Sequence, residues 1–310
     1  MNATSLKTAL GPLYNLYKDE KIYAICVDAY NEVYYYQGKG ESKLLDKAFK
    51  SESGLKLQVN KMLKMVDKDS LNKDNIFFNL NDFTSVHVVF PPVSARGISI
   101  TITKLPQRIL SLDDLVKFKA IREDGKAIIE KLISEGKGIL VAGNAGSGKT
   151  TLLNMIIASI PQPQKVVTLE KYPDLIIKRQ RVARLQTKSQ KNEELVELVE
   201  MAERMYPDYV ILSNCEGPEV MPFLELVRNN YSGIALITGE NPLDALKRLE
   251  TKAVISSEGL SLEDCRYAIS QAFPYLVFQE RMEDGSRVLT SINEVKYENG
   301  ELKLKNLYKA

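Results

Sequence analysis

The stretch Gly143-Asn144-Ala145-Gly146-Ser147-Gly148-Lys149-Thr150 fits the pattern G-x-x-x-x-G-K-[ST] of a phosphate-binding P-loop. Its glycines allow backbone N–H groups to curl around phosphate oxygens, because no Cβ stands in the way. Lys149 is placed to reach the β- and γ-phosphates as a point charge, and the Thr150 hydroxyl is placed to bind Mg²⁺. We therefore expect ATP and Mg²⁺ as cofactors, held by Gly143, Asn144, Ala145, Gly146, Ser147, Gly148, Lys149, Thr150 and Thr151.

The segments around this loop alternate between strand and helix patterns. Residues 138–142 predict a buried strand before the loop, and residues 151–160 predict a helix that ends before Pro161. Because the later strands are continuously apolar and alternate with helices, they predict a parallel, doubly wound sheet. The later strand segments are 166–170, 209–213 and 233–238, and the helical segments are 192–205, 218–228 and 243–250.

The pattern changes near the end of the chain. Residues 275–279 and 287–292 predict strands around an Asp-Gly turn at 284–285, and an Asn-Gly turn precedes a further strand at 301–305. Two turn signals of this kind predict an antiparallel β-meander on the periphery of the sheet. The fold class is therefore α/β, with a P-loop domain over residues 113–310.

The first hundred residues mix short strands and helices. We expect a smaller α+β domain over residues 1–105, followed by a linker over residues 106–112. Ser111 is the expected N-cap of the next helix, because acidic residues follow it. Within the smaller domain the predicted strands are 22–28, 32–37, 85–90 and 98–103, with a turn at 38–42 and a core helix at 55–66.

The composition excludes several classes of protein. The 42 Lys and Arg residues nearly balance the 40 Asp and Glu residues, and there is no recognition helix, so we expect no nucleic-acid partner. Cys26, Cys215 and Cys265 lack paired spacing, which argues against disulfides or a zinc site and fits a reducing cytosol. His87 is the only histidine, which excludes a multi-histidine metal site. Without a signal-peptide core or an apolar run of ~20 residues, we expect a cytoplasmic protein that reaches the inner face of the cell membrane through partners.

Several stretches in a fixed order resemble one family. The P-loop is followed by Val-Val-Thr-Leu-Glu at 166–170, Gly-Pro-Glu at 217–219, Asn-Pro-Leu-Asp-Ala-Leu-Lys-Arg-Leu-Glu-Thr at 241–251 and Asp-Gly-Ser-Arg-Val-Leu-Thr-Ser-Ile-Asn-Glu-Val at 284–295. This order and spacing resemble the secretion ATPases of type II and type IV secretion, and come nearest to the tight-adherence (Flp) pilus assembly ATPases. The resemblance covers nearly all of the C-terminal domain and is weaker before it.

This resemblance implies a RecA-like C-terminal domain in a two-domain subunit of a hexameric ring. Nucleotide would lie between the domains, and its turnover would drive pilus assembly or protein secretion through an inner-membrane platform protein. The partners that it implies are further copies of the chain and that membrane protein.

The chain departs from the family at positions that carry chemistry. The Gly-Glu that ends the third strand in the family reads Ser-Asn214 here, and an amide supplies neither a base nor a negative charge. The family's Arg before Gly-Pro-Glu reads Glu216, the Asp of its Thr-x-Glu-Asp box reads Lys171, and the His of its Thr-x-His-Ala-Asn box reads Thr238. The N-terminal arginines of the family are matched only by Lys104, which lacks the bidentate fork of arginine.

These losses spare the phosphate cradle and remove groups that act on the phosphate, so we expect an ATP-binding subunit with weak or lost hydrolysis. Glu170 is the best remaining candidate for positioning water, and Glu216 is a second catalytic candidate because it shares a strand face with Asn214. The alternative is a pseudo-ATPase that acts as a structural or regulatory partner of an active paralogue in a hetero-oligomer. A P-loop kinase or GTPase is disfavoured, because the chain has no Asn-Lys-x-Asp motif.

Two further clusters leave alternatives open. Lys178, Arg179, Arg181 and Arg184 form a basic cluster that faces a neighbouring subunit's nucleotide, an acidic partner or solvent. The three tyrosines at 34–36 form either a partner surface or a strand with one buried face.

Overall fold

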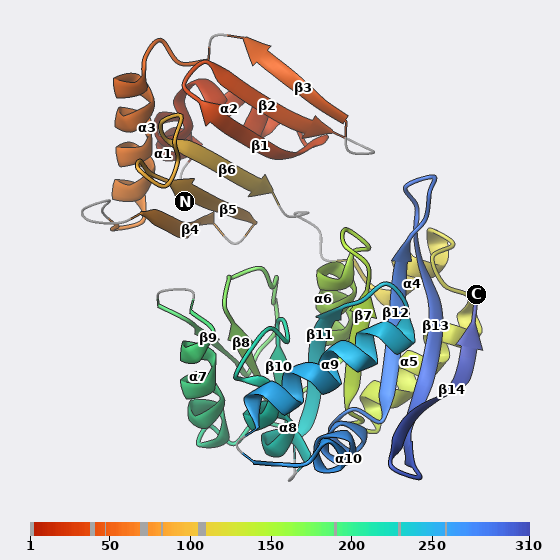
Figure 1. Ribbon diagram of the computed structural model, residues 1–310. Coiled ribbons are helices and arrows are strands. Elements are labelled where there is room, and N and C mark those ends of the chain that lie inside the picture. Colours follow the sequence, from red (N-terminus) through yellow and green to blue (C-terminus); the bar gives the residue numbers. More distant parts are fainter. Residues whose placement is uncertain are drawn as a thin grey trace. The chain divides into compact units, whose positions relative to one another are not determined.

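The chain forms two compact units, Met1–Arg108 and Ile109–Ala310, drawn in Figure 1. Residues 106–109 of the predicted linker and residues 38–40 of the predicted turn lie outside the described residues. Within the described ranges, no helix combines the length and apolar character that a bilayer span requires. The computed structural model describes residues 3–37, 41–46, 48–68, 74–81, 83–104, 110–188, 191–228, 231–257 and 259–310.

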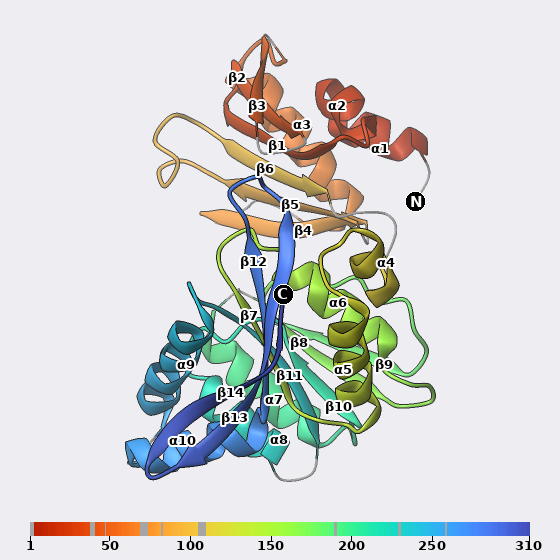
Figure 2. The same cartoon turned by 90° about the vertical axis from the view of Figure 1, so that its right-hand side faces the viewer.

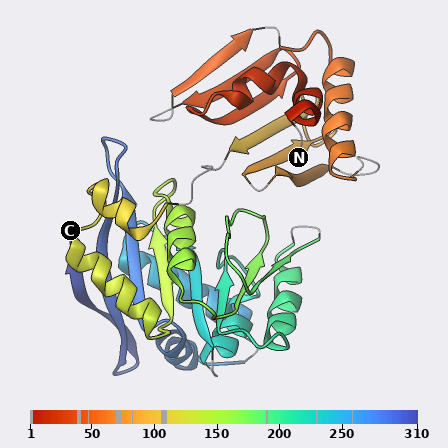
Figure 3. The same ribbon diagram turned by 180° about the vertical axis from the view of Figure 1, so that it is seen from behind.

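The N-terminal unit is a six-stranded antiparallel sheet with helices on one face, seen from behind in Figure 3. The order of its strands is β3-β2-β1-β6-β5-β4. Its elements are α1 (Ala3–Leu10), a 3-10 turn (Gly11–Leu13), α2 (Tyr14–Lys18), β1 (Ile22–Ala29), β2 (Glu32–Gln37), β3 (Glu41–Asp46), α3 (Glu52–Met65), β4 (Asn75–Asn81), β5 (Thr84–Val89) and β6 (Ser99–Lys104).

Alternation of side chains places one face of this sheet in the core. In β6, Ile100 and Ile102 are fully buried and Thr101 is exposed, so the buried face packs against α1 and α3. Helix α3 begins after Ser51, whose hydroxyl accepts a hydrogen bond from Gly54 N at 3.2 Å. The sequence pattern of a strand face and a capped amphipathic helix therefore accounts for this layer.

The predicted strands at 22–28 and 32–37 and the core helix at 55–66 are confirmed. The sequence pattern misses β3 and β4, and Glu41 and Ser42 of the predicted turn belong to β3. Both missed strands lie at the edges of the sheet, where one side of the backbone is unpaired and polar residues are tolerated.

The C-terminal unit is built around an eight-stranded sheet with the order β14-β13-β12-β7-β11-β10-β8-β9. Its elements are α4 (Leu112–Lys117), α5 (Glu123–Ser134), β7 (Ile139–Gly143), α6 (Lys149–Ser159), β8 (Val166–Glu170), β9 (Val182–Gln186), α7 (Glu193–Glu203), β10 (Tyr209–Leu212), α8 (Val220–Arg228), β11 (Ser232–Thr238), α9 (Pro242–Ser256), α10 (Leu262–Ala272), β12 (Tyr275–Arg281), β13 (Arg287–Glu298) and β14 (Glu301–Lys309).

Strands β9, β8, β10, β11, β7 and β12 run parallel, which confirms the predicted parallel sheet. Strands β12, β13 and β14 form the predicted antiparallel meander. Because β12 also pairs with β7, the meander continues the central sheet. The carboxyl ends of the parallel strands therefore share one edge, which is where α/β proteins bind ligands.

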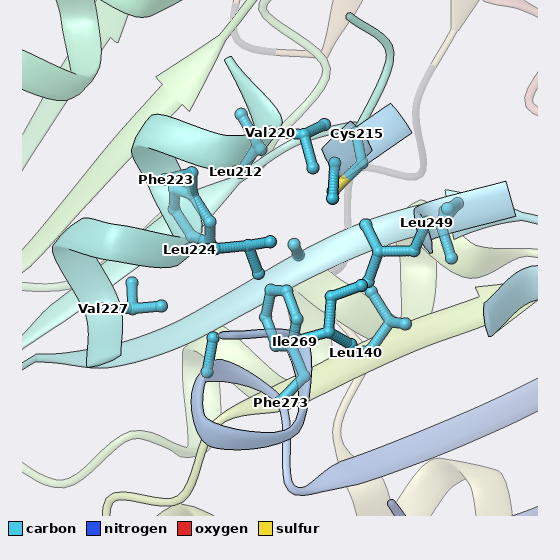
Figure 4. Close-up of a cluster of buried hydrophobic side chains, with 14 of the residues drawn as sticks. Leu140, Leu212, Cys215, Val220, Phe223, Leu224, Val227, Leu249, Ile269 and Phe273 are labelled. Atoms are coloured by element: carbon cyan, nitrogen blue, oxygen red, sulfur yellow. The ribbon is translucent and has the colours of Figure 1, made fainter. Parts of the chain in front are cut away.

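Helices cover both faces of this sheet, and each face has its own core, as Figure 2 shows from the side. Helices α7 to α10 pack on one face, and α4, α5 and α6 pack on the other. On the first face, the rings of Phe223 and Phe273 stack with centroids 6.1 Å apart (Figure 4). Cys215 lies in the same cluster near Val220, and burial raises the pKa of its thiol, so it behaves as an apolar core residue.

Several elements of this unit escape the sequence prediction. Helices α5 and α10 and strand β9 are not predicted, and β9 is a partly exposed edge strand. Ser111 does cap α4, since its hydroxyl accepts from Asp114 N at 3.3 Å in a capping box. Leu112, the last residue of the predicted linker, is already the first residue of α4.

Candidate nucleotide-binding site

The first glycine of the P-loop is fixed by the packing of three strands. Gly143 ends the fully buried strand β7 and lies in register between Thr238 of β11 and Gln279 of β12. A Cβ on Gly143 would collide with the carbonyl oxygen of Gln279. Glycine therefore lets the neighbouring strand approach closely where the loop leaves the sheet.

The loop itself has the backbone of a phosphate cradle. Gly146 has a φ of 73° and Gly148 a φ of 90°, both in the left-handed region that glycine adopts without strain. Gly148 is the N-cap residue of α6, which begins at Lys149. The first N–H groups of a helix have no partner within the helix and carry partial positive charge, so the loop leads into an anion-binding terminus.

Lys149 lies folded back over this loop. Its Nζ atom donates to the carbonyl oxygen of Asn144 at 2.8 Å. Burial lowers the pKa of the Lys149 ammonium, and the nearby Glu240 carboxylate opposes that shift. The hydroxyl of Ser147 is fully buried and has no hydrogen-bond partner among the residues that the structure describes. The loop therefore holds one cation and one orphaned polar group beside its backbone donors.

This donor set fits a nucleotide phosphate with Mg²⁺. Thr150 and Thr151 lie in the first turn of α6 and are half-buried. Two left-handed glycines, an ammonium group and a hydroxyl at the helix start are the groups that phosphate oxygens and a hard cation require. Bound there, Mg²⁺ would neutralise phosphate charge; Thr150 would supply the hydroxyl ligand, and Lys149 would supply the fixed positive charge.

Glu170 ends β8 and is completely buried. Arg184 of β9 donates to both of its oxygens, from Nε at 2.9 Å and from an Nη atom at 2.7 Å. Thr168 Oγ1 and Leu175 N donate to the same carboxylate at 2.8 and 3.3 Å. A carboxylate with four donors is held in a fixed orientation, so a water that approached Glu170 would compete with Arg184.

The segment after β10 carries the substituted residues. Asn214 Nδ2 donates to one carboxylate oxygen of Glu216, and Lys171 Nζ contacts the other at 3.1 Å. Glu219 is fully buried, and its Oε1 accepts from the backbone N atoms of Glu216 and Gly217 at 2.6 and 3.0 Å. The carboxylate of Glu216 is therefore shared between an amide and an ammonium group from two strand ends.

Thr238 occupies the position where the family resemblance implies a histidine. It is the last residue of β11 and pairs in register with Gly143. The next residue, Gly239, donates its N–H to the carbonyl oxygen of Gly143 at 3.1 Å. The end of β11 is thus bonded to the first residue of the P-loop.

Two arginines beside the loop are missed by the sequence analysis. Arg287 Nε donates to the carbonyl oxygen of Gly146 at 3.2 Å, and Arg281 N donates to Asn144 Oδ1 at 3.0 Å. They lie well over a hundred residues beyond the loop in the chain, on the hairpin of β12 and β13. The available signals were the predicted hairpin turn at 284–285 and the family-like stretch 284–295, which contains Arg287. Because β12 runs parallel to β7, that hairpin reaches the P-loop edge.

The basic cluster at 178–184 makes contacts within the chain. Arg179 donates to the carbonyl oxygens of Ile157, Ile160, Pro161 and Gln164 around the end of α6, at distances from 2.7 to 3.3 Å. Arg181 donates to the carbonyl oxygen of Pro163, and Arg184 binds Glu170. Arg179 and Arg181 therefore hold the segment that follows α6, and Arg184 joins β9 to the end of β8.

Lys104, the match to the family's N-terminal arginines, is engaged within its own unit. Its Nζ atom donates to the carbonyl oxygens of Tyr17 and Asp19, both at 2.6 Å. Burial lowers the pKa of this ammonium. The residue fastens the end of β6 to the segment between α2 and β1.

The structure thus gathers the predicted site residues into two groups. The P-loop residues surround the start of α6, with Glu240 near Lys149. Glu170 lies with Arg184, and Glu216 lies with Lys171 and Asn214, at the ends of β8 and β10. All of these ends lie on the carboxyl edge of one sheet.

The chain is similar to proteins of conjugation, secretion and pilus systems. It is 28% identical over 215 residues to the conjugal transfer protein TrbB of Rhizobium radiobacter, and the aligned part covers 68% of this chain and 64% of that protein. It is 25% identical over 327 residues to VirB11 of Bartonella henselae, which covers 91% and 90% of the two chains. The chain thus spans just under two thirds of the TrbB relative.

Solved structures share the fold. The pilus retraction motor PilT, solved with bound ADP, has a TM-score of 0.65 at 16% identity, covering 91% of this chain and 81% of that chain. The Legionella pneumophila ATPase DotB has a TM-score of 0.62 at 16% identity, covering 96% and 82%. The family of type II/IV secretion system proteins matches residues 42–272, which is more than half of the chain. The chain therefore belongs to the type II/IV secretion system protein family, within the superfamily of secretion ATPases.

Proposed function

We propose that this protein is an ATP-binding subunit of a type II/IV-like secretion or pilus-assembly motor, and that it hydrolyses ATP weakly or not at all. The observation that carries the first part is the intact cradle: Gly146 and Gly148 in left-handed conformations lead into α6, with Lys149 folded over the loop. PilT, a structural neighbour, was solved with bound ADP. Family membership, fold and loop geometry together support nucleotide binding.

Weak hydrolysis follows from the groups beside the loop. Phosphoryl transfer depends on charge stabilisation and on a positioned water. Asn214 offers an amide where the family resemblance implies a carboxylate, and the nearby Glu216 carboxylate is already shared with Lys171. Glu170, the remaining candidate for positioning water, is fully buried against Arg184. The size of such effects is shown by an arginine finger, a different charge-stabilising group, whose loss costs about 10³ to 10⁵ in rate.

In this role, ATP changes the conformation of the subunit mainly by binding, and hydrolysis by each subunit contributes less. The subunit assembles as a homo-oligomer, and a hexameric ring is the expected form. The oligomer lies at the cytoplasmic face of the membrane, where it binds a membrane platform protein and no nucleic acid. Whether the machine secretes protein or assembles a tight-adherence pilus follows from that partner. The alternative is a pseudo-ATPase that shares a hetero-oligomer with an active paralogue, which the same substitutions at Asn214 and Thr238 favour.

Nucleotide titration tests the binding. Purified wild type, Lys149→Ala and Lys131→Ala are titrated with a non-hydrolysable ATP analogue in the presence of Mg²⁺. Lys131 is an exposed lysine of α5 that pairs with Glu135, so its variant controls for the loss of one charge. We expect wild type and Lys131→Ala to bind alike, and Lys149→Ala to bind at least about tenfold more weakly, which corresponds to about 1.4 kcal/mol. Absence of binding by the folded wild type, or equal binding by Lys149→Ala, would contradict the proposal.

Asn214→Glu separates the two forms of the proposal. Restoring the carboxylate supplies the charge that the metal site lacks. In a motor with residual turnover, the variant is expected to hydrolyse ATP faster than wild type. A pseudo-ATPase that works through a paralogue would gain nothing alone, and would change turnover only when it is mixed with the active subunit.

A further inference from the structure

The hairpin of β12 and β13 sets two arginines side by side. Arg281 and Arg287 are direct partners in the antiparallel register, so their side chains project from the same face. Both are exposed. Like charges placed directly opposite each other across two strands are destabilising, unless something of opposite charge lies between them. The register of the hairpin nevertheless holds these two guanidinium groups on one face.

The turn of this hairpin holds the two arginines in that register. Gly285 has a φ of 81°, and its N–H donates to the carbonyl oxygen of Met282 at 2.9 Å. Asp284 Oδ1 accepts from Ser286 N at 2.8 Å. Met282 N donates to the carbonyl oxygen of Ser286 at 2.9 Å, which closes the hairpin. The juxtaposition of Arg281 and Arg287 is thus set by a well-bonded turn.

Both arginines lie against the glycines of the P-loop. Arg287 Nε donates to the carbonyl oxygen of Gly146 at 3.2 Å, and its Cδ would lie 3.0 Å from a Cβ on Gly148. An Arg281 Nη atom would lie 3.4 Å from a Cβ on Gly146. Since β12 runs parallel to β7, the hairpin rises at the same edge of the sheet as the P-loop (Figure 1). Both guanidinium groups therefore lie within contact distance of the glycines of the loop.

We propose that Arg281 and Arg287 form a guanidinium pair that binds the terminal phosphate of ATP within the same chain. This inference rests on the proposed function and names further residues of the same site. The backbone N–H groups of the loop serve the inner phosphates, and Lys149 reaches the β- and γ-phosphates from one side. The terminal phosphate carries the largest charge, and the planar fork of arginine matches its oxygens.

Arg287 belongs to the family-like stretch 284–295, whereas Lys104 departs from the family. The family resemblance implies N-terminal arginines directed to the phosphates, and their match, Lys104, is bonded to Tyr17 and Asp19. Within the C-terminal unit, the hairpin supplies positive charge beside the P-loop. Within the described residues, Arg287 forms no ion pair with a carboxylate, so its charge is available to a phosphate.

Selectivity between ATP and ADP tests the pair. Dissociation constants for a non-hydrolysable ATP analogue and for ADP, both with Mg²⁺, are measured for wild type, Arg281→Gln and Arg287→Gln. Each variant is expected to raise the constant for the ATP analogue about tenfold, and the constant for ADP less than about threefold. Arg281→Lys, which keeps the charge without the fork, is expected to fall between Arg281→Gln and wild type.

Arg228→Gln serves as the matched control. Arg228 is an exposed arginine at the end of α8. It precedes the start of β11, so it lies at the edge of the sheet opposite to the P-loop. Its loss removes the same charge from the protein and is expected to leave both constants unchanged. A change of equal size for Arg228→Gln would reduce the effect to net charge and overturn the inference.

The remaining outcomes separate the two proposals. If wild type binds both nucleotides and both variants keep the wild-type ratio of the two constants, the pair does not bind the terminal phosphate. An equal loss for ATP and ADP would assign the arginines to the shape of the loop and would also overturn the inference. If the folded wild type binds neither nucleotide, the proposed function fails and this inference fails with it.

Discussion

The Nζ atom of Lys171 lies 3.1 Å from Oε2 of Glu216, which joins the segments that follow β8 and β10. The family resemblance implies an aspartate at the first position and an arginine at the second. The two positions therefore still carry one positive and one negative charge, but the positive charge is now at residue 171 and the negative charge at residue 216. Two substitutions that are separate departures in the sequence form a single compensated change in the structure.

Exchanging this pair tests that compensation. Lys171→Glu or Glu216→Lys alone would place like charges together, whereas the double variant restores an opposite pair. The side chains are 19% and 35% exposed, so we expect a coupling energy of only about 1 kcal/mol in urea unfolding. The exposed pair Lys131–Glu135, exchanged in the same way, is the control and should give about 0.5 kcal/mol or less. A double variant that is no more stable than the sum of its single losses would contradict the account.

Glu170→Gln should destabilise the fold as well as the site. The change removes the charge that faces Arg184 at 2.7 Å and leaves a guanidinium group without its bidentate partner. Breaking a buried ion pair in this way costs about 3–5 kcal/mol, and the 29% exposure of Arg184 lowers the expected loss to about 2–3 kcal/mol. The exposed Glu203→Gln on α7 should stay within about 0.5 kcal/mol. Unchanged stability of Glu170→Gln would mean that the carboxylate is free for another role.

The carboxyl group of Asp174 should make stability depend on pH. Burial, and then the charge of Glu170, raise the pKa of Asp174 to about 6, while Arg184 acts in the opposite direction. Because the folded state holds this proton more tightly than the unfolded state, stability falls as the pH rises from about 4 to about 6. Asp174→Asn removes the titration and should be more stable than wild type at pH 7.5, by about 1–3 kcal/mol.

Urea unfolding of wild type and Asp174→Asn across this pH range gives the difference directly. The difference in the free energy of unfolding between the two proteins should grow from pH 4 to pH 6 and stay constant above pH 7. A gap that is constant across the whole range, or that closes as the pH rises, would show that Asp174 keeps an ordinary carboxyl group.

Arg179 should be necessary for the end of the P-loop helix. Its guanidinium group donates to four carbonyl oxygens around the C-terminus of α6, which a lysine ammonium cannot reproduce from one position. We expect Arg179→Lys to cost about 2 kcal/mol, since buried acceptors would lose their donors. Thermal unfolding of this variant beside Arg181→Lys, which loses a bond to one carbonyl only, measures the effect. Equal stability of the two variants would refute the capping role.

The sheet and the P-loop could be predicted because their signals are local. Strands such as Tyr209–Leu212 are continuously apolar, which is typical of a strand buried on both faces. The motif at 143–150 also requires glycine for reasons that the structure bears out at Gly143 and Gly148. Strand β9 could not be found in this way, because an edge strand with Arg184 on it lacks an apolar run.

The contacts around the loop depend on distant parts of the chain, so the sequence pattern could not supply them. Arg281 and Arg287 reach the P-loop only because β12 pairs with β7, a pairing between segments more than a hundred residues apart. Lys171 and Glu216 meet only because β8 and β10 are neighbours. The sequence alone indicated that residues 171 and 216 differ from the family pattern. The pairing of the strands shows that these two residues contact each other.

Steady-state release of phosphate from Mg²⁺-ATP, at concentrations that saturate the wild type, measures whether the protein turns over the ATP that it binds. In the proposed function, Lys149 and the loop bind ATP, while Asn214 leaves the site without the charge that turnover needs. We therefore expect wild type to release phosphate at most slightly faster than Lys149→Ala. Release by wild type that is many times faster than release by Lys149→Ala would contradict it, and would show that neighbouring groups replace the missing carboxylate.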